Sequence, residues 1–96
     1  MREDESPKVD EATVKYQELA SKLEKEGSYY EAIEMYKKNL RSGLMATAVT
    51  KIGNCYFWLE MYQEAMKWYK KGLNLDRKNK HAYNGLGNVY DAIGDP

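Results

Sequence analysis

Residues 46–79, ATAVTKIGNCYFWLEMYQEAMKWYKKGLNLDRKN, decide the fold. Their second half places apolar side chains three or four residues apart, at positions 62, 65, 66, 69 and 73. An earlier stretch does the same at positions 29, 32, 33, 36 and 40. This spacing is typical of an amphipathic helix that buries one face. The two stretches therefore predict two helices with one apolar side each.

The pattern belongs to a repeat that spans most of the sequence. Residues 13–45, 46–79 and 80–96 align with offsets of 33 and then 34 residues. Ala20, Gly53 and Gly87 share one column, and Tyr36 and Tyr69 share another. Small side chains in register with large rings indicate two helices that cross closely, where a bulky residue would overpack the crossing by about 1–3 kcal/mol. Because each unit cannot bury its apolar face alone, we expect the units to stack.

The repeat resembles the tetratricopeptide repeat family, whose unit of about 34 residues carries a Trp-Leu-Gly-Tyr-Ala-Phe-Pro signature. Residues of the second copy stand at the signature's Leu, Gly, Tyr, Ala and Phe positions: Ile52, Gly53, Tyr56, Ala65 and Tyr69. The third copy matches with Tyr83, Leu86, Gly87, Tyr90 and Gly94. Two departures are Arg77 at the usual Pro position and Glu60 at a usual Gly position. If Glu60 needs a positive φ, the strain costs about 1 kcal/mol.

The resemblance implies an all-α fold, a right-handed α-solenoid of helix-turn-helix hairpins with two full units and the first helix of a third. We expect five helices, near residues 7–26, 29–42, 46–59, 62–76 and 80–93. They form one domain over 1–96, with a lead-in at 1–12 and repeats at 13–45, 46–79 and 80–96. Three local signals support these bounds: Ser6-Pro7 as a helix start, Ser28 with Glu31 as a capping box, and Gly43 as a helix stop.

Composition excludes several classes of function. The 15 basic and 15 acidic side chains balance, which disfavours nucleic acid as a partner because phosphate binding needs excess Lys and Arg. Residues 1–36 nevertheless carry five more acids than bases, and residues 37–96 five more bases than acids. With one Cys and one His we predict no metal, no cofactor and no enzymatic activity. No apolar run suits a membrane. Cys55 is the single cysteine, and we expect it to be a small core residue. A chain that can form no internal disulfide fits a reducing compartment, so we expect a cytoplasmic protein.

The resemblance also implies where a partner binds, because stacked hairpins present an inner groove lined by the first helix of each hairpin. The candidate groove residues are Gln17, Ser21, Thr50, Asn54, Phe57, Trp58, His81, Asn84 and Asn88. The carboxamides of Asn54 and Asn88 share a column and suit a peptide backbone, since they donate and accept. Of the adjacent Phe57 and Trp58, we expect one in the core and one exposed as an anchor.

One specific ligand of the family is not expected. The family's carboxylate clamp for acidic chaperone tails uses Lys and Asn on the first hairpin, Asn on the second, and Lys plus a basic residue on the third. In the same order, the matching positions here hold Gln17, Ser21, Lys51, His81 and Gly85, and none of the five matches.

The function predicted is therefore an adaptor or scaffold that binds a protein or peptide in its groove. Two alternatives stay open. The apolar stripe of Tyr83, Leu86 and Tyr90 has no partner helix in this sequence, so the chain either continues into further repeats or self-associates as a homo-oligomer there. The other alternative is that the chain is a targeting domain of a larger enzyme.

Overall fold

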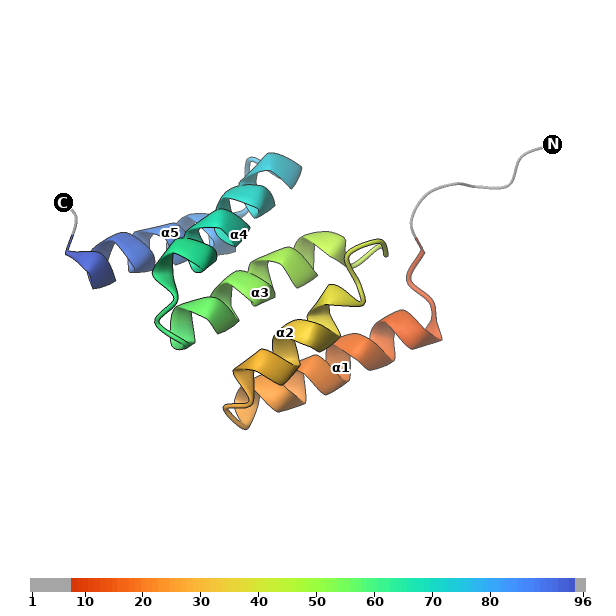
Figure 1. Cartoon of the computed structure of the whole chain (residues 1–96). Helices are drawn as coiled ribbons and strands as arrows, with labels where there is room; N and C mark the ends of the chain where they lie inside the picture. The colour runs from red at the N-terminus through yellow and green to blue at the C-terminus, as the bar shows by residue number, and fades with distance from the viewer. Residues whose placement is uncertain (1–7, 95–96) are drawn as a thin grey trace.

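The computed structural model describes residues 8–94. Within that range the chain forms five α-helices joined by short turns, which confirms the predicted all-α repeat fold (Figure 1). The helices are α1 Glu11–Lys25, α2 Tyr29–Lys37, α3 Met45–Trp58, α4 Tyr62–Leu75 and α5 Lys80–Ile93. None of them is long and apolar enough to cross a membrane.

Helix α1 begins later than predicted. Its N-cap is Asp10, whose carboxylate accepts hydrogen bonds from the backbone N–H of Thr13 (2.9 Å) and from its hydroxyl (2.8 Å). These bonds satisfy amide groups that the first turn of a helix leaves without partners, and they lower the pKa of Asp10. Residues 8–10 precede the helix, so the predicted start near residue 7 is wrong. The Ser6-Pro7 signal lies outside the described residues.

Helix α2 is shorter than predicted, and the prediction that Gly43 ends it is wrong. The helix stops at Lys37, and the next three N–H groups bond to carbonyls three residues back, which tightens the chain into turns. Asn39 fixes this departure: it is buried and its amide donates to the carbonyl of Thr13 on α1 (2.9 Å). The segment therefore folds back on α1 instead of continuing the helix.

The predicted capping box at Ser28 and Glu31 is also wrong. Ser28 is the N-cap of α2, but its side chain makes no capping hydrogen bond. Its own N–H donates to the carbonyl of Leu23 (2.8 Å), so that N–H is not free for Glu31. This bond belongs to the turn that ends α1, in which Gly27 has φ +81°.

The turn between α3 and α4 repeats the same geometry with a different residue. Met61 N–H donates to the Tyr56 carbonyl (2.9 Å), as Ser28 does to Leu23 in the first hairpin. The left-handed position that Gly27 fills there is occupied by Glu60, with φ 61°. The condition on which the strain at Glu60 depends, a positive φ, is therefore met.

Consecutive helices pack side by side and build two connected apolar cores (Figure 1). The first core lies between α1, α2 and α3; its buried residues are Ala20, Ala32, Ile33, Tyr36, Ala48, Ile52 and Cys55. The second lies between α4 and α5, with Ala65, Tyr69 and Val89 buried and Leu86 and Phe57 packed against it. Tyr69 is the largest buried side chain of this second core, and it is 2% exposed.

Glycine makes room for the Tyr69 ring, as the repeat columns predict. A Cβ at Gly53 would lie 2.8 Å from a ring carbon of Tyr69. A Cβ at Gly85 on α5 would also collide with that ring. The ring is therefore held between the backbones of α3 and α5.

Candidate binding groove

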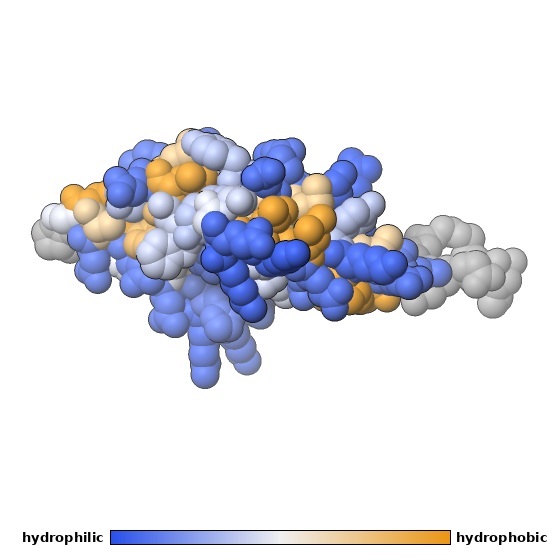
Figure 2. Space-filling model, turned by 90° about the horizontal axis from the view of Figure 1, so that it is seen from below, coloured by the Kyte–Doolittle hydropathy of each residue, from blue (hydrophilic) through white to orange (hydrophobic). Residues whose placement is uncertain are grey.

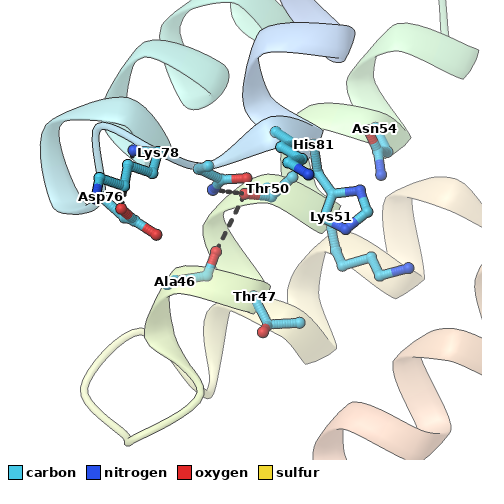
Figure 3. A pocket seen from close by; sticks show the side chains of 10 residues that line it. Ala46, Thr47, Thr50, Lys51, Asn54, Asp76, Lys78 and His81 are labelled. Atoms are coloured by element: carbon cyan, nitrogen blue, oxygen red, sulfur yellow. Dashed lines mark hydrogen bonds between the residues drawn. The ribbon is translucent and has the colours of Figure 1, made fainter.

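A hollow of about 510 Å³ lies where α3 meets the α4–α5 connection and the start of α5 (Figure 3). It is lined by Ala46, Thr47, Thr50, Lys51, Asn54, Asp76, Lys78, Asn79, Lys80 and His81. Three of the predicted groove residues, Thr50, Asn54 and His81, meet here although they come from two separate repeats. Their positions in the repeat therefore predicted a common location for residues that lie up to 31 positions apart in the chain.

One wall of this hollow is fixed by a short chain of hydrogen bonds. The amide of Asn79 donates to the hydroxyl of Thr50 (3.1 Å), which itself donates to the carbonyl of Ala46 (3.2 Å), as Figure 3 shows. Asn79 also caps α5, since its side-chain oxygen accepts from the N–H of Ala82 (3.1 Å). Thr50 is buried, and its hydroxyl is already used within the protein. Thr50 thus joins α3 to the start of α5.

Asn54 presents donors to the hollow. Its side-chain oxygen accepts a hydrogen bond from the hydroxyl of Tyr69 (2.5 Å). A carboxamide has one oxygen and one NH₂ group, so this bond sets which end faces the core. The NH₂ group, with two N–H donors, is the end that remains for a ligand acceptor.

The charged residues around the hollow are mostly basic. Lys51, Lys78 and Lys80 line it together with His81, and Asp76 is the single acid of the lining. Figure 3 shows Lys51, Asn54 and His81 grouped on its right side. Ammonium and amide donors favour ligand groups with exposed oxygens, such as peptide carbonyls and carboxylates.

A second hollow of about 310 Å³ continues this surface toward α1. It is lined by Ser21, Glu24, Lys25, Tyr29, Lys51 and Trp58. Lys51 borders both hollows, and the surface that the two hollows occupy along α1, α3 and the start of α5 is called the groove below. Trp58 is 60% exposed, which leaves its indole ring free for contact.

The structure separates the other predicted groove residues. Phe57 is half-buried and packs edge-on against Trp58 (ring centroids 5.4 Å apart) and against Tyr62 (5.7 Å). The expectation that one of the adjacent aromatics joins the core while the other is exposed is thus confirmed. Asn84 and Asn88 are exposed on α5 but line neither hollow. Gln17 is half-buried, and its side-chain oxygen has no hydrogen-bond partner among the described residues.

The predicted groove residues leave out two lysines near the α4–α5 connection. Lys78 and Lys80 both line the larger hollow. The repeat columns describe helices, whereas Lys78 stands between α4 and α5 and Lys80 is the first residue of α5. A signal was present in Asn79, because an N-cap residue fixes where the connection ends and α5 begins.

The cysteine and two of the tyrosines are buried in the cores. Cys55 is fully buried, and burial raises the pKa of its thiol to about 12, which agrees with the predicted core role. Burial likewise raises the pKa of Tyr36 and of Tyr69. Within residues 8–94 no three acidic, His or Cys side chains gather as a metal site would require.

Comparisons with known proteins found similarity to a repeat family in the second half of the chain. The family model described as TPR repeat matches residues 53–94. Among solved structures, the first TPR of Spaghetti (RPAP3) bound to HSP90 peptide SRMEEVD is similar over 95% of this chain and 99% of that chain, with 22% sequence identity and a TM-score of 0.49. No curated protein matches the chain.

Proposed function

We propose that the chain is a protein-interaction module, because residues 53–94 match the model of the tetratricopeptide repeat family. Its groove along α1, α3 and the start of α5 binds an extended segment of another protein. The observation that carries the proposal is the Asn54 amide, whose oxygen is held by Tyr69 and whose donors line a hollow rich in lysine. An extended backbone offers carbonyl oxygens at regular spacing, which suits such donors.

The charge of the groove suggests the composition of the segment. Lys51, Lys78 and Lys80 lie around one hollow with a single acid, Asp76. A segment with Asp or Glu side chains gains from these charges, and the gain falls as salt screens them. Trp58 adds an exposed aromatic surface at the other hollow, of the kind enriched among residues that dominate binding energy.

A random peptide library selected against the immobilised chain tests the proposal. The selected peptides are expected to carry excess Asp and Glu, and their affinity is measured by fluorescence anisotropy. Asn54→Asp keeps the oxygen that accepts from Tyr69 and removes the NH₂ donors, so folding is retained while affinity falls by about threefold to tenfold. Lys51→Glu reverses a charge that borders both hollows and is expected to weaken binding by at least about tenfold.

The matched control is Lys70→Glu, which makes the same charge change on the exposed surface of α4, outside both hollows. It is expected to leave affinity within about twofold, as rim charges usually do. Peptides that bind Asn54→Asp and Lys51→Glu as tightly as the unchanged chain would place the binding surface elsewhere. Selected peptides without acidic residues would refute the charge argument alone.

The self-associating scaffold predicted as an alternative makes a different prediction. It requires oligomers without any ligand, held by the face of Tyr83, Leu86 and Tyr90, and Tyr90→Lys would dissociate them. Sedimentation at high micromolar concentration separates it from the groove proposal. A cytoplasmic location, the absence of a cofactor and of nucleic-acid partners, and a role as the targeting domain of an enzyme remain predictions from the sequence.

A further inference from the structure

Trp58 is exposed in the groove although its helix has neighbours on both sides. Helix α3 packs against α2 and against α4, yet Trp58 is 60% exposed. Its ring packs edge-on against Phe57, and Phe57 in turn packs edge-on against Tyr62. Because these contacts hold the indole ring in place before a partner binds, little side-chain freedom is lost when a ligand covers it. An exposed ring that is fixed in this way suits an anchor for a ligand side chain.

The smaller hollow beside Trp58 disfavours a ligand cation. Lys25 and Lys51 line it with two ammonium groups, and Glu24 supplies one carboxylate. That carboxylate already accepts a hydrogen bond from the hydroxyl of Tyr36 (2.8 Å). A Lys or Arg side chain of a ligand therefore meets like charges in this hollow.

An aromatic side chain fits the same hollow. The rings of Trp58 and Tyr29 belong to its lining and offer surfaces for ring packing. The ammonium groups beside them are attracted to the face of a ring. A pair of this kind already exists in the chain, where the ammonium group of Lys71 lies 4.7 Å from the centre of the Trp68 ring. The smaller hollow therefore favours Phe, Tyr or Trp from a partner.

The two hollows lie along one face of α3, so their separation follows from helix geometry. Lys51, Asn54 and Trp58 stand three and four residues apart and share one side of the helix. Thr50, in the wall of the larger hollow, stands eight residues before Trp58, which is about 12 Å along the helix axis. An extended chain covers this distance in about four residues, and side chains four residues apart point to the same side. A segment that lies along α3 therefore reaches both hollows with side chains from one of its faces.

We propose that the groove selects an extended segment with an aromatic side chain four residues away from an Asp or Glu. The ring lies beside Trp58, and the carboxylate lies among the lysines of the larger hollow. This inference rests on the proposed function and specifies its ligand. Between the two side chains the backbone of the segment passes Asn54, whose NH₂ group remains for a carbonyl oxygen.

The rest of the visible surface does not favour a purely apolar segment. On the face that Figure 2 shows, hydrophobic residues lie in separate patches among hydrophilic ones. A segment that combines a ring with a charged side chain therefore does not compete there with a continuous apolar strip. Its preferred site is the groove, where rings and lysines stand next to each other.

Titration of the ¹⁵N-labelled chain with synthetic peptides, followed by NMR, tests the inference. Each peptide has about twelve residues of Ser and Thr with blocked ends, and it carries one Phe and one Glu separated by two to six residues, in either order. Affinity is expected to be highest at a separation of four. Separations of three and five are expected to bind at least about threefold more weakly, because they point the two side chains to opposite sides. Replacing the Phe of the best peptide with Ala is expected to weaken binding by at least about tenfold.

A variant of the chain locates the ring. Trp58→Ala is expected to weaken the best peptide by at least about tenfold and to leave the peptide with Ala in place of Phe unchanged, because both changes remove the same contact. Tyr30→Ala is the matched control, since it removes another exposed ring (63%) that lines neither hollow. It is expected to keep the affinity of the best peptide within about twofold. Circular dichroism at 222 nm checks that both variants remain helical.

The outcomes separate this inference from the proposed function. An affinity that does not depend on the separation would overturn the inference, and so would a Trp58→Ala chain that loses equal affinity for the peptides with and without Phe. If Lys51→Glu and Asn54→Asp still weaken binding in either case, the proposed function stands. If neither variant weakens it, the proposed function fails as well. Absence of binding by every peptide at millimolar concentration would overturn the inference alone, because the selected library tests the proposed function independently.

Discussion

Replacing Gly53 with Ala adds a single methyl group where α3 crosses α4 against the ring of Tyr69. Ala is the better helix former by about 1 kcal/mol, so propensity alone predicts a gain in stability. The new Cβ, however, would lie 2.8 Å from a ring carbon of Tyr69 and 2.9 Å from another. Overpacking of this kind costs about 1–3 kcal/mol where the neighbour cannot move.

The Tyr69 ring cannot move away without a further loss. On its other side lies the backbone of α5 at Gly85. In the first hairpin Ala20 occupies the column of Gly53, and the Tyr36 hydroxyl donates to Glu24 (2.8 Å). In the second hairpin Phe57 stands at the position of Glu24, so a Tyr69 ring displaced by the added methyl group finds no acceptor there. A displaced Tyr69 loses its bond to Asn54, at a cost of about 1 kcal/mol.

Gly53→Ala is therefore expected to lower the free energy of unfolding by about 1–3 kcal/mol, because packing and hydrogen bonding outweigh helix propensity. Gly87→Ala is the matched control: the same substitution, in the same column, where nothing lies within 4 Å. It is expected to raise stability by up to about 1 kcal/mol. Urea unfolding followed by circular dichroism at 222 nm measures both. Equal stabilisation by the two substitutions would refute the account of the crossing.

Three further predictions follow from particular residues. Glu60→Gly is expected to raise the melting temperature by several degrees, because φ 61° strains a residue with a Cβ by about 1 kcal/mol; an unchanged or lower melting temperature would contradict this. Cys55 is expected not to react with a disulfide reagent at pH 8 until the chain is unfolded in urea, since it is fully buried and its thiol pKa is raised to about 12; rapid reaction of the folded chain would contradict it. The lowered pKa of Asp10 contributes stability that is present above the ordinary value of 3.8 and is lost as pH falls through the folded value, so Asp10→Asn, which keeps the cap, is expected to flatten the acid limb of a stability–pH curve; an unaltered limb would contradict it.

The sequence was informative wherever one column repeats. The pairing of Gly53 with Tyr69 and the burial of Cys55 were predicted from register and from residue type and are confirmed. Cys55 packs in the core between α1, α2 and α3, whereas the contact between Gly53 and Tyr69 lies within one hairpin. A repeat shows such contacts two or three times, so the pattern is legible without coordinates.

Segments between hairpins were predicted poorly for a physical reason. The end of α2 depends on Asn39, which bonds to the backbone of Thr13 26 residues earlier, and no local signal marks that bond. Of the lysines that line the larger hollow, Lys78 lies in the α4–α5 connection and Lys80 is the first residue of α5, so neither position follows from an apolar helix face. Long-range contacts of irregular segments override the local propensities on which the helix bounds were predicted.

Tyr69 links the stability of the fold to the chemistry of the groove. Its ring requires glycine on α3 and on α5, and its hydroxyl sets the orientation of the Asn54 amide. A substitution at Gly53 therefore acts twice: it strains the crossing, and it releases Asn54 from the orientation that aims its donors at the hollow. Gly53→Ala should for this reason weaken groove ligands even under conditions where the chain stays folded, whereas Asn54→Asp should weaken them without altering the crossing. If Gly53→Ala lowers both the free energy of unfolding and the affinity of groove ligands, the core sets the shape of the groove. If it lowers only the free energy of unfolding, the groove is independent of that core.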